Sequence, residues 1–228
     1  MAKTNINLER RAEIGRERRA RTRGKILSAA FDIFGDEQGL FARIEDIVDK
    51  AGVTRPTFYN HFSGMEELRE ALSYEVTHDF LLAVTDTISA LPDARDRSAA
   101  AIRFYLHRAR DDRRWAWSML NISASGIIFG AETYRQAEQT VREGMETDVF
   151  IIPSSKVGRD ILLGSCLAAM GSITREDTPD EYPEVVAGYI LFALGVPYDL
   201  AKEIAQQPMP ALVPASGEEA PGGTSSPR

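Results

Sequence analysis

The chain of 228 residues has one cysteine and three histidines. It has no apolar run of the length, about 18 residues, that a membrane-spanning helix requires. With Cys166 as the one thiol an internal disulfide is excluded, and such a composition suits a reducing cytoplasm. Residues 1–19 lack the apolar stretch of a signal peptide. We therefore expect a soluble, cytoplasmic protein.

The scarcity of histidine also argues against an enzyme. His61, His78 and His107 do not sit in a His-x-x-x-His spacing or in a carboxylate-paired spacing typical of a metal site. A Gly-rich phosphate loop and a Gly-x-Ser-x-Gly elbow are missing as well. We expect no catalytic residues, no cofactor and no metal. A helical hydrolase or metal enzyme is the weaker alternative.

Positive charge is scarce overall, since the net charge is −7, but it is concentrated at one end. Residues 1–25 carry nine basic and three acidic side chains, a net charge of +6, so the remainder is strongly acidic. This asymmetry is typical of a protein whose one end meets a polyanion. The alternative is a solvated, salt-bridged helix surface.

Apolar residues recur at helical spacing, and alternating strand patterns are absent, so the sequence predicts an all-α protein. Leu27, Ala30 and Phe34 mark one face of a helix that ends near Gly35. The tail 207–228 is rich in proline, glycine and serine, and we expect it to be disordered. Further helices are expected at 44–51, 55–62, 65–90, 97–111, 113–128, 131–147, 156–175, 181–195 and 198–206.

The segment 44–62 predicts two short helices joined by a tight turn at Gly52. Thr54 suits the N-cap of the second helix, and Pro56 is tolerated in its first turn. At 100° per residue, Phe58 and Phe62 point inward together, whereas Pro56, Thr57 and Asn60 point outward. A short helix held at a fixed angle with a polar outer face is what the DNA major groove admits.

Residues 26–68 resemble the N-terminal domain of TetR-family regulators. The resemblance covers roughly residues 23–70. It rests on an ordered set of residues: Phe34, Gly35, Ile47, Ala51, Gly52, Val53, Thr54, Thr57, Tyr59, His61 and Phe62.

The resemblance implies a DNA-binding set of Arg43, Thr54, Arg55, Pro56, Thr57, Tyr59, Asn60 and His61. Arg43, Thr57, Tyr59 and His61 match positions that hold phosphates, whereas Arg55, Pro56 and Asn60 match positions that face base edges. Two residues depart from the pattern. Met65 replaces a phosphate-binding lysine, for which the basic arm offers a substitute. Glu45 either accepts from a cytosine amino group or pairs with Arg43.

The resemblance further implies a helical ligand-binding and dimerisation domain. The helices at 156–175 and 181–195 are apolar nearly all round, and Gly164, Ala168 and Gly171 would let a partner helix approach; plain core is the alternative. Aromatic bulk beside Ser123, Ser125 and Gly126 suggests an apolar effector cavity, although such clusters are also ordinary core. The candidate effector contacts are Phe104, Trp115, Trp117, Met119 and Phe129.

The sequence therefore predicts a basic arm (1–22), a helix-turn-helix domain (23–70), an effector-binding and dimerisation domain (71–206) and a tail. The expected function is a dimeric repressor that binds a palindromic operator and is released by a partly apolar small molecule. Repression is the habit of the family and does not follow from these residues. The alternative is a protein-binding adaptor that keeps the fold without specific operator binding.

Overall fold

The computed structural model describes residues 2–124, 126 and 128–213, with side chains from residue 10 onward. Every regular element among them is a helix, which confirms the predicted all-α class. The elements are α1 (Ala2–Phe34), the 3-10 helix η1 (Glu37–Phe41), α2 (Ile44–Ala51), α3 (Arg55–Tyr59), α4 (Met65–Ser89), α5 (Ala94–Asp111), α6 (Arg113–Ser123), α7 (Gly130–Glu146), α8 (Ser155–Arg175), α9 (Tyr182–Ala193) and α10 (Tyr198–Gln206).

The predicted helices are confirmed to within a few residues, with three differences. Helix α1 continues without a break across residue 22, where the arm was predicted to end. Helix α6 ends at Ser123 rather than 128, because Gly126 and Phe129 take left-handed backbone angles, with φ of 103° and 60°. The element η1 was not predicted. Its five residues are too few to show a helical period.

The C-terminal tail is only partly described. Residues 207–213 contain no helix, and the Val213 amide donates to Thr87 Oγ1 at 2.9 Å. The rest of the predicted tail, 214–228, lies outside the described residues, as does Ser125. Among the residues described, no helix combines the length and apolarity needed to cross a bilayer.

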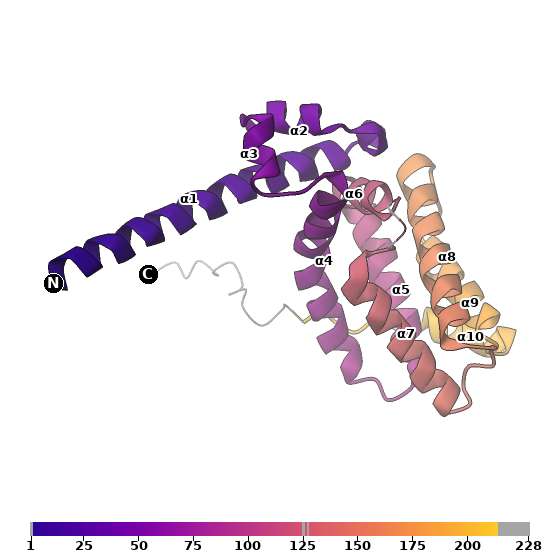
Figure 1. Cartoon of the computed structure of the whole chain (residues 1–228). Coiled ribbons are helices and arrows are strands. Elements are labelled where there is room, and N and C mark those ends of the chain that lie inside the picture. The colour runs from indigo at the N-terminus through magenta and orange to yellow at the C-terminus, as the bar shows by residue number, and fades with distance from the viewer. Residues whose placement is uncertain (1, 125, 127, 214–228) are drawn as a thin grey trace, which may run out of the picture.

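The first three α-helices and the start of α4 enclose one end of a continuous core (Figure 1). Their buried side chains include Ile26, Phe34, Ile47, Phe58, Phe62 and Leu68. Helix α4 then continues along the bundle that α5 to α10 complete. The N-terminal part of α1 projects from this body, on the side opposite α8 and α9. The molecule thus presents α2 and α3 at one end.

A polar clamp joins α6 to the end of α1. The Asn121 amide donates at 2.8 Å to the carbonyl oxygens of both Phe34 and Asp36, where helix termination leaves acceptors unfilled. Arg114 also pairs with Asp32 of α1. Because Asn121 is buried, the clamp is shielded from water and fixes the two parts relative to each other.

Candidate nucleic-acid interface and ligand cavity

Local capping residues set the geometry of α2 and α3. The Arg43 amide donates to Asp46 Oδ2 at 2.8 Å, which satisfies a free donor at the start of α2. Gly52 ends α2 with φ 64° and ψ 39°, a left-handed conformation that glycine adopts without steric cost. Thr54 Oγ1 then accepts from the Thr57 amide at 3.3 Å and begins α3. These three features confirm the predicted helix-turn-helix.

Helix α3 is anchored by its aromatic side. Phe58 and Phe62 are 0% and 1% exposed, as the spacing predicted. The regular helix ends at Tyr59, earlier than the predicted Phe62. The chain nevertheless stays coiled, because the Phe62 amide donates to the Phe58 carbonyl at 3.0 Å. The recognition element is therefore a short helix followed by one more turn.

The outer face of this element is polar and open to solvent. Of the eight residues predicted to bind DNA, Thr57 and His61 are partly buried. The exposed ones are Arg43, Thr54, Arg55, Pro56, Tyr59 and Asn60. Six of the eight predicted residues are thus accessible to a partner.

Glu45 and Arg55 form an ion pair. Glu45 Oε1 lies 2.7 Å from Arg55 Nη1, and Arg55 Nη2 donates to the Tyr59 hydroxyl at 3.5 Å. The hydrogen bond to Tyr59 and the charge of Glu45 raise the pKa of Arg55. The predicted pairing of Glu45 with Arg43 is wrong, since Arg43 Nε lies 3.7 Å from Asp46 Oδ2 instead. The carboxylate holds Arg55 along the surface of the recognition element.

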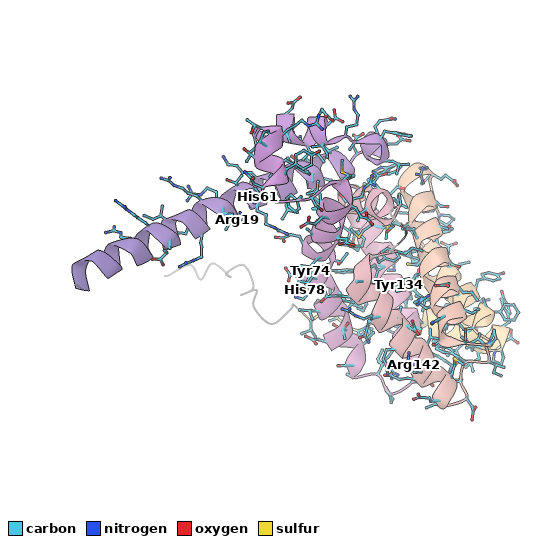
Figure 2. All side chains as sticks on the ribbon, viewed as in Figure 1. Arg19, His61, Tyr74, His78, Tyr134 and Arg142 are labelled. Atoms are coloured by element: carbon cyan, nitrogen blue, oxygen red, sulfur yellow. The ribbon has the colours of Figure 1, made fainter. Side chains whose placement is uncertain are left out.

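Helix α1 contacts the C-terminal end of the recognition element, where Figure 2 shows Arg19 beside His61. Arg19 Nη2 donates to the Asn60 carbonyl at 2.8 Å, and the Arg23 guanidinium lies 5.0 Å from the centre of the Phe62 ring. Burial, together with the positive charges of Arg19 and Arg23, lowers the pKa of His61. Sequence reasoning missed this contact, because nothing in the spacing of arginines in α1 indicates the carbonyl that one of them meets.

A cavity of about 50 Å³ lies among α4, α5, α7 and α8. Its wall is largely apolar, with a few polar groups. The Ser98 hydroxyl is buried without a hydrogen-bond partner among the described residues. The Tyr105 hydroxyl lies 3.3 Å from Thr133 Oγ1, and burial raises the pKa of this phenol, so it stays neutral. Burial also raises the pKa of the Cys166 thiol in the wall to about 12.

Only one of the five candidate effector residues lines this cavity. Phe129 does, in edge contact with the Tyr105 ring at 5.2 Å. Trp115 is buried beside them, and its indole nitrogen donates to the Val76 carbonyl at 3.3 Å. Phe104, Trp117 and Met119 are also buried, but they are not part of the cavity wall. Phe129 therefore borders open space, whereas the other four residues are packed within the core.

We call the exposed and half-buried apolar residues of α8 and α9 the apolar face of these two helices. Gly164 and Ala168 lie on it, and nothing stands within 4 Å of where a Cβ of Gly164 would be. Gly171, predicted to continue the stripe, is buried, and its Cβ would meet Arg175 and Leu120. The large exposed side chains of this face are Val157, Val185, Tyr189 and Phe192.

An all-helical fold that presents a helix-turn-helix at one end and a larger bundle behind it defines a DNA-binding transcriptional regulator. Residues 26–72 match the family described as bacterial regulatory proteins, tetR family. Residues 93–207, half of the chain, match the tetracyclin repressor-like C-terminal domain. The protein belongs to the TetR family of transcriptional regulators.

A similar curated protein is the HTH-type transcriptional activator FasR of Mycolicibacterium smegmatis. It is 32% identical over 83 residues, which make up 36% of this chain and 38% of that protein. The alignment therefore spans well under half of the relative's length.

Among solved structures, RolR in complex with resorcinol has a TM-score of 0.68 at 22% identity, over 86% of this chain and 99% of that one. FadR from Bacillus subtilis in complex with stearoyl-CoA has a TM-score of 0.57 at 16% identity, over 75% and 96%. At these identities the likeness establishes the shared fold.

Proposed function

We propose that this regulator binds an operator as a homodimer and that a small, largely apolar molecule controls the binding. The observation that carries the proposal is the open face of α3. Phe58 and Phe62 fix the element from within, while Arg55, Tyr59 and Asn60 stand exposed on its outer side. The proposal keeps the four domains expected from the sequence, which are divided after residues 22, 70 and 206.

The exposed residues divide by chemistry. Arg55 has the forked donors that suit guanine, and Asn60 has the paired donor and acceptor that suit adenine, so we assign these two and Pro56 to base edges. Arg43, Thr54, Thr57, Tyr59 and His61 carry hydroxyl, imidazole or guanidinium groups, which suit phosphate oxygens. On binding DNA, Arg55 must exchange its Glu45 partner for a base. The loss of this ion pair reduces the net free energy that the base contact contributes.

The homodimer is proposed to form through the apolar face of α8 and α9. In an isolated chain this apolar face is exposed to water, whereas a second copy packed against it would bury it. One test is the mass in solution of Phe192→Glu, with Phe41→Glu as control, because Phe41 is 75% exposed and belongs to η1, not to α8 or α9. We expect a dimer for the parent and for Phe41→Glu, and a monomer for Phe192→Glu. A dimeric Phe192→Glu variant contradicts this interface.

The effector is proposed to enter the cavity beside Phe129 and Tyr105. At about 50 Å³ the space holds little more than one or two water molecules, so the ligand must separate α4 from α7 or α8 to fit. Helix α4 supplies Leu81 and Val84 to the cavity wall and Leu68 to the core of the DNA-binding end. A shift of α4 would therefore change the distance between the two recognition helices of the dimer. The ligand can change the affinity for DNA only as far as its own affinities for the two conformations differ. We further propose that the protein is a cytoplasmic repressor and that ligand binding releases it from its operator.

The decisive experiment is selection of duplexes from a random pool by the wild-type protein. We expect a palindrome whose half-sites lie about one helical turn, roughly 10 base pairs, apart. Arg55→Ala should relax the base preference at one position of each half-site, whereas Tyr59→Ala should weaken binding to all sequences alike. Matched controls are Arg142→Ala and Tyr74→Ala, which remove exposed side chains of the same types from α7 and α4 (Figure 2).

The outcomes distinguish the proposal from its alternative. A selected palindrome with the two expected variant effects supports an operator-binding regulator. Recovery of no preferred sequence, with all four variants equal to the wild type on random DNA, points to the adaptor that keeps the fold. That adaptor is favoured by Met65 and by the Glu45–Arg55 pair, both of which reduce the positive charge available to DNA.

A further inference from the structure

The N-terminal part of α1 is a feature that the two family matches do not cover, since they begin at residues 26 and 93. Residues 10–25 carry eight basic and two acidic side chains. They form a continuation of the helix that packs in the core, and the part before Arg19 projects beyond the body in Figures 1 and 2.

The basic side chains of this extension have few partners of their own. In a solvated, salt-bridged helix, Glu13 and Glu17 would pair with arginines one turn away. In the part of the chain that the structure describes, neither does. The exposed basic residues without an ion pair there are Arg10, Arg11, Arg16, Arg18, Arg19, Arg21 and Lys25, of which Arg19 donates a hydrogen bond to the Asn60 carbonyl. Their mutual repulsion favours a polyanionic partner.

The direction of the extension is fixed relative to the recognition element. Arg19 and Arg23 contact the far end of that element, through the Asn60 carbonyl and the Phe62 ring. Beyond Arg19 the helix rises about 1.5 Å per residue, so Arg10 lies about 14 Å further out. On a duplex that rises about 3.4 Å per base pair, this corresponds to about four base pairs. Any duplex held by α3 therefore has its flank within reach.

We propose that residues 10–18 of α1 bind the phosphate backbone of the DNA that flanks each half-site, on the side away from the dimer axis. This inference rests on the proposed function, because α3 must first hold the duplex. The extension points away from α8 and α9, so the two copies in a dimer would reach outward rather than toward each other. Guanidinium groups suit this partner because they pair with phosphate oxygens in a forked geometry. The contact adds affinity without adding sequence preference.

The test crosses a change in the protein with a change in the DNA. The protein variant is Arg11→Gln/Arg16→Gln/Arg18→Gln, which keeps helix propensity and replaces side chains that form no ion pair with any described residue. The matched control, Arg135→Gln/Arg142→Gln/Lys202→Gln, removes the same charge from exposed positions of the body. The DNA probes are one duplex selected by the wild type with long flanks and the same duplex trimmed by about four base pairs at each end.

For the wild type and the control variant we expect trimming to weaken binding by about tenfold or more at moderate salt. The extension variant should bind the long duplex as weakly as the trimmed one. Its slope of log K against log salt should fall by about 0.9 for each phosphate that the variant no longer neutralises. Far-UV circular dichroism checks that all variants remain helical.

Three results overturn the inference. If the extension variant responds to trimming as the wild type does, the flank is not bound by this helix, and the proposed function stands. If the control variant loses the same affinity, the effect belongs to net charge and not to the extension. If the wild type selects no duplex at all, the proposed function fails first and the inference falls with it.

Discussion

Two buried serines are predicted to respond in opposite directions to the same substitution. Ser98 is 2% exposed in the cavity wall, and its hydroxyl has no partner among the described residues. A buried hydroxyl left unsatisfied costs about 1–3 kcal/mol. We expect Ser98→Ala to stabilise the free protein by about 1 kcal/mol, since the small void that it leaves offsets part of the gain. For a chain of this size, that raises Tm by about 2–4 °C.

Ser118 is the matched control, because it is 0% exposed and its hydroxyl donates to the Phe31 carbonyl at 3.4 Å. Ser118→Ala removes this hydrogen bond, and we expect it to lower stability by about 0.5–1 kcal/mol. Thermal and denaturant unfolding of the two variants measure both values against the wild type. If Ser98→Ala destabilises the protein as much as Ser118→Ala, the Ser98 hydroxyl has a partner and offers no unsatisfied group to an effector.

Three further predictions concern the rest of the molecule. Asn121→Leu breaks the clamp between α6 and α1, so unfolding should show a loss of about 2 kcal/mol, or about 4–8 °C in Tm, and an unchanged Tm contradicts the clamp. The pKa of His61 is lower in the folded protein than its ordinary value of 6.5, so just below pH 6.5 the native state binds fewer protons than the unfolded state. The free energy of unfolding should therefore decrease as the pH is lowered through this range. In denaturant unfolding, His61→Gln should reduce the dependence of the free energy of unfolding on pH, and the same dependence in variant and wild type would contradict this role of His61. Cys166, with its pKa raised to about 12, should react with a thiol reagent far more slowly in the native protein than in denaturant, and equal rates would place the thiol at the surface.

Much of the fold could be predicted because its determinants are local. The turn at Gly52, the cap at Thr54 and the pair Phe58 and Phe62 lie within a dozen residues of one another, and each acts through sequence spacing alone. Helix α1 shows the limit of that approach. Its core-facing stripe indicates a helix as far as Gly35, but polar residues further back give no sign that the helix continues to Ala2.

The interactions that position the candidate site are long-range and could not be predicted. Arg19 meets a carbonyl 41 residues away, and Asn121 meets one 87 residues away, so no spacing rule relates them. The cavity is harder still, since its wall combines α4, α5, α7 and α8. Phe129 was found through aromatic bulk. Ser98 was missed, because a serine on a helix gives no sign of facing an opening.

The central claim, that the outer face of α3 enters a DNA groove, is tested most directly by crosslinking from Asn60. Asn60→Cys places a thiol on that face, its backbone carbonyl can still accept from Arg19, and native Cys166 is buried. With a selected duplex that carries a thiol-reactive base in each half-site, we predict efficient crosslinking from Asn60→Cys and none from Tyr74→Cys on α4. DNA-bound protein that crosslinks through Tyr74→Cys and not through Asn60→Cys would contradict the account.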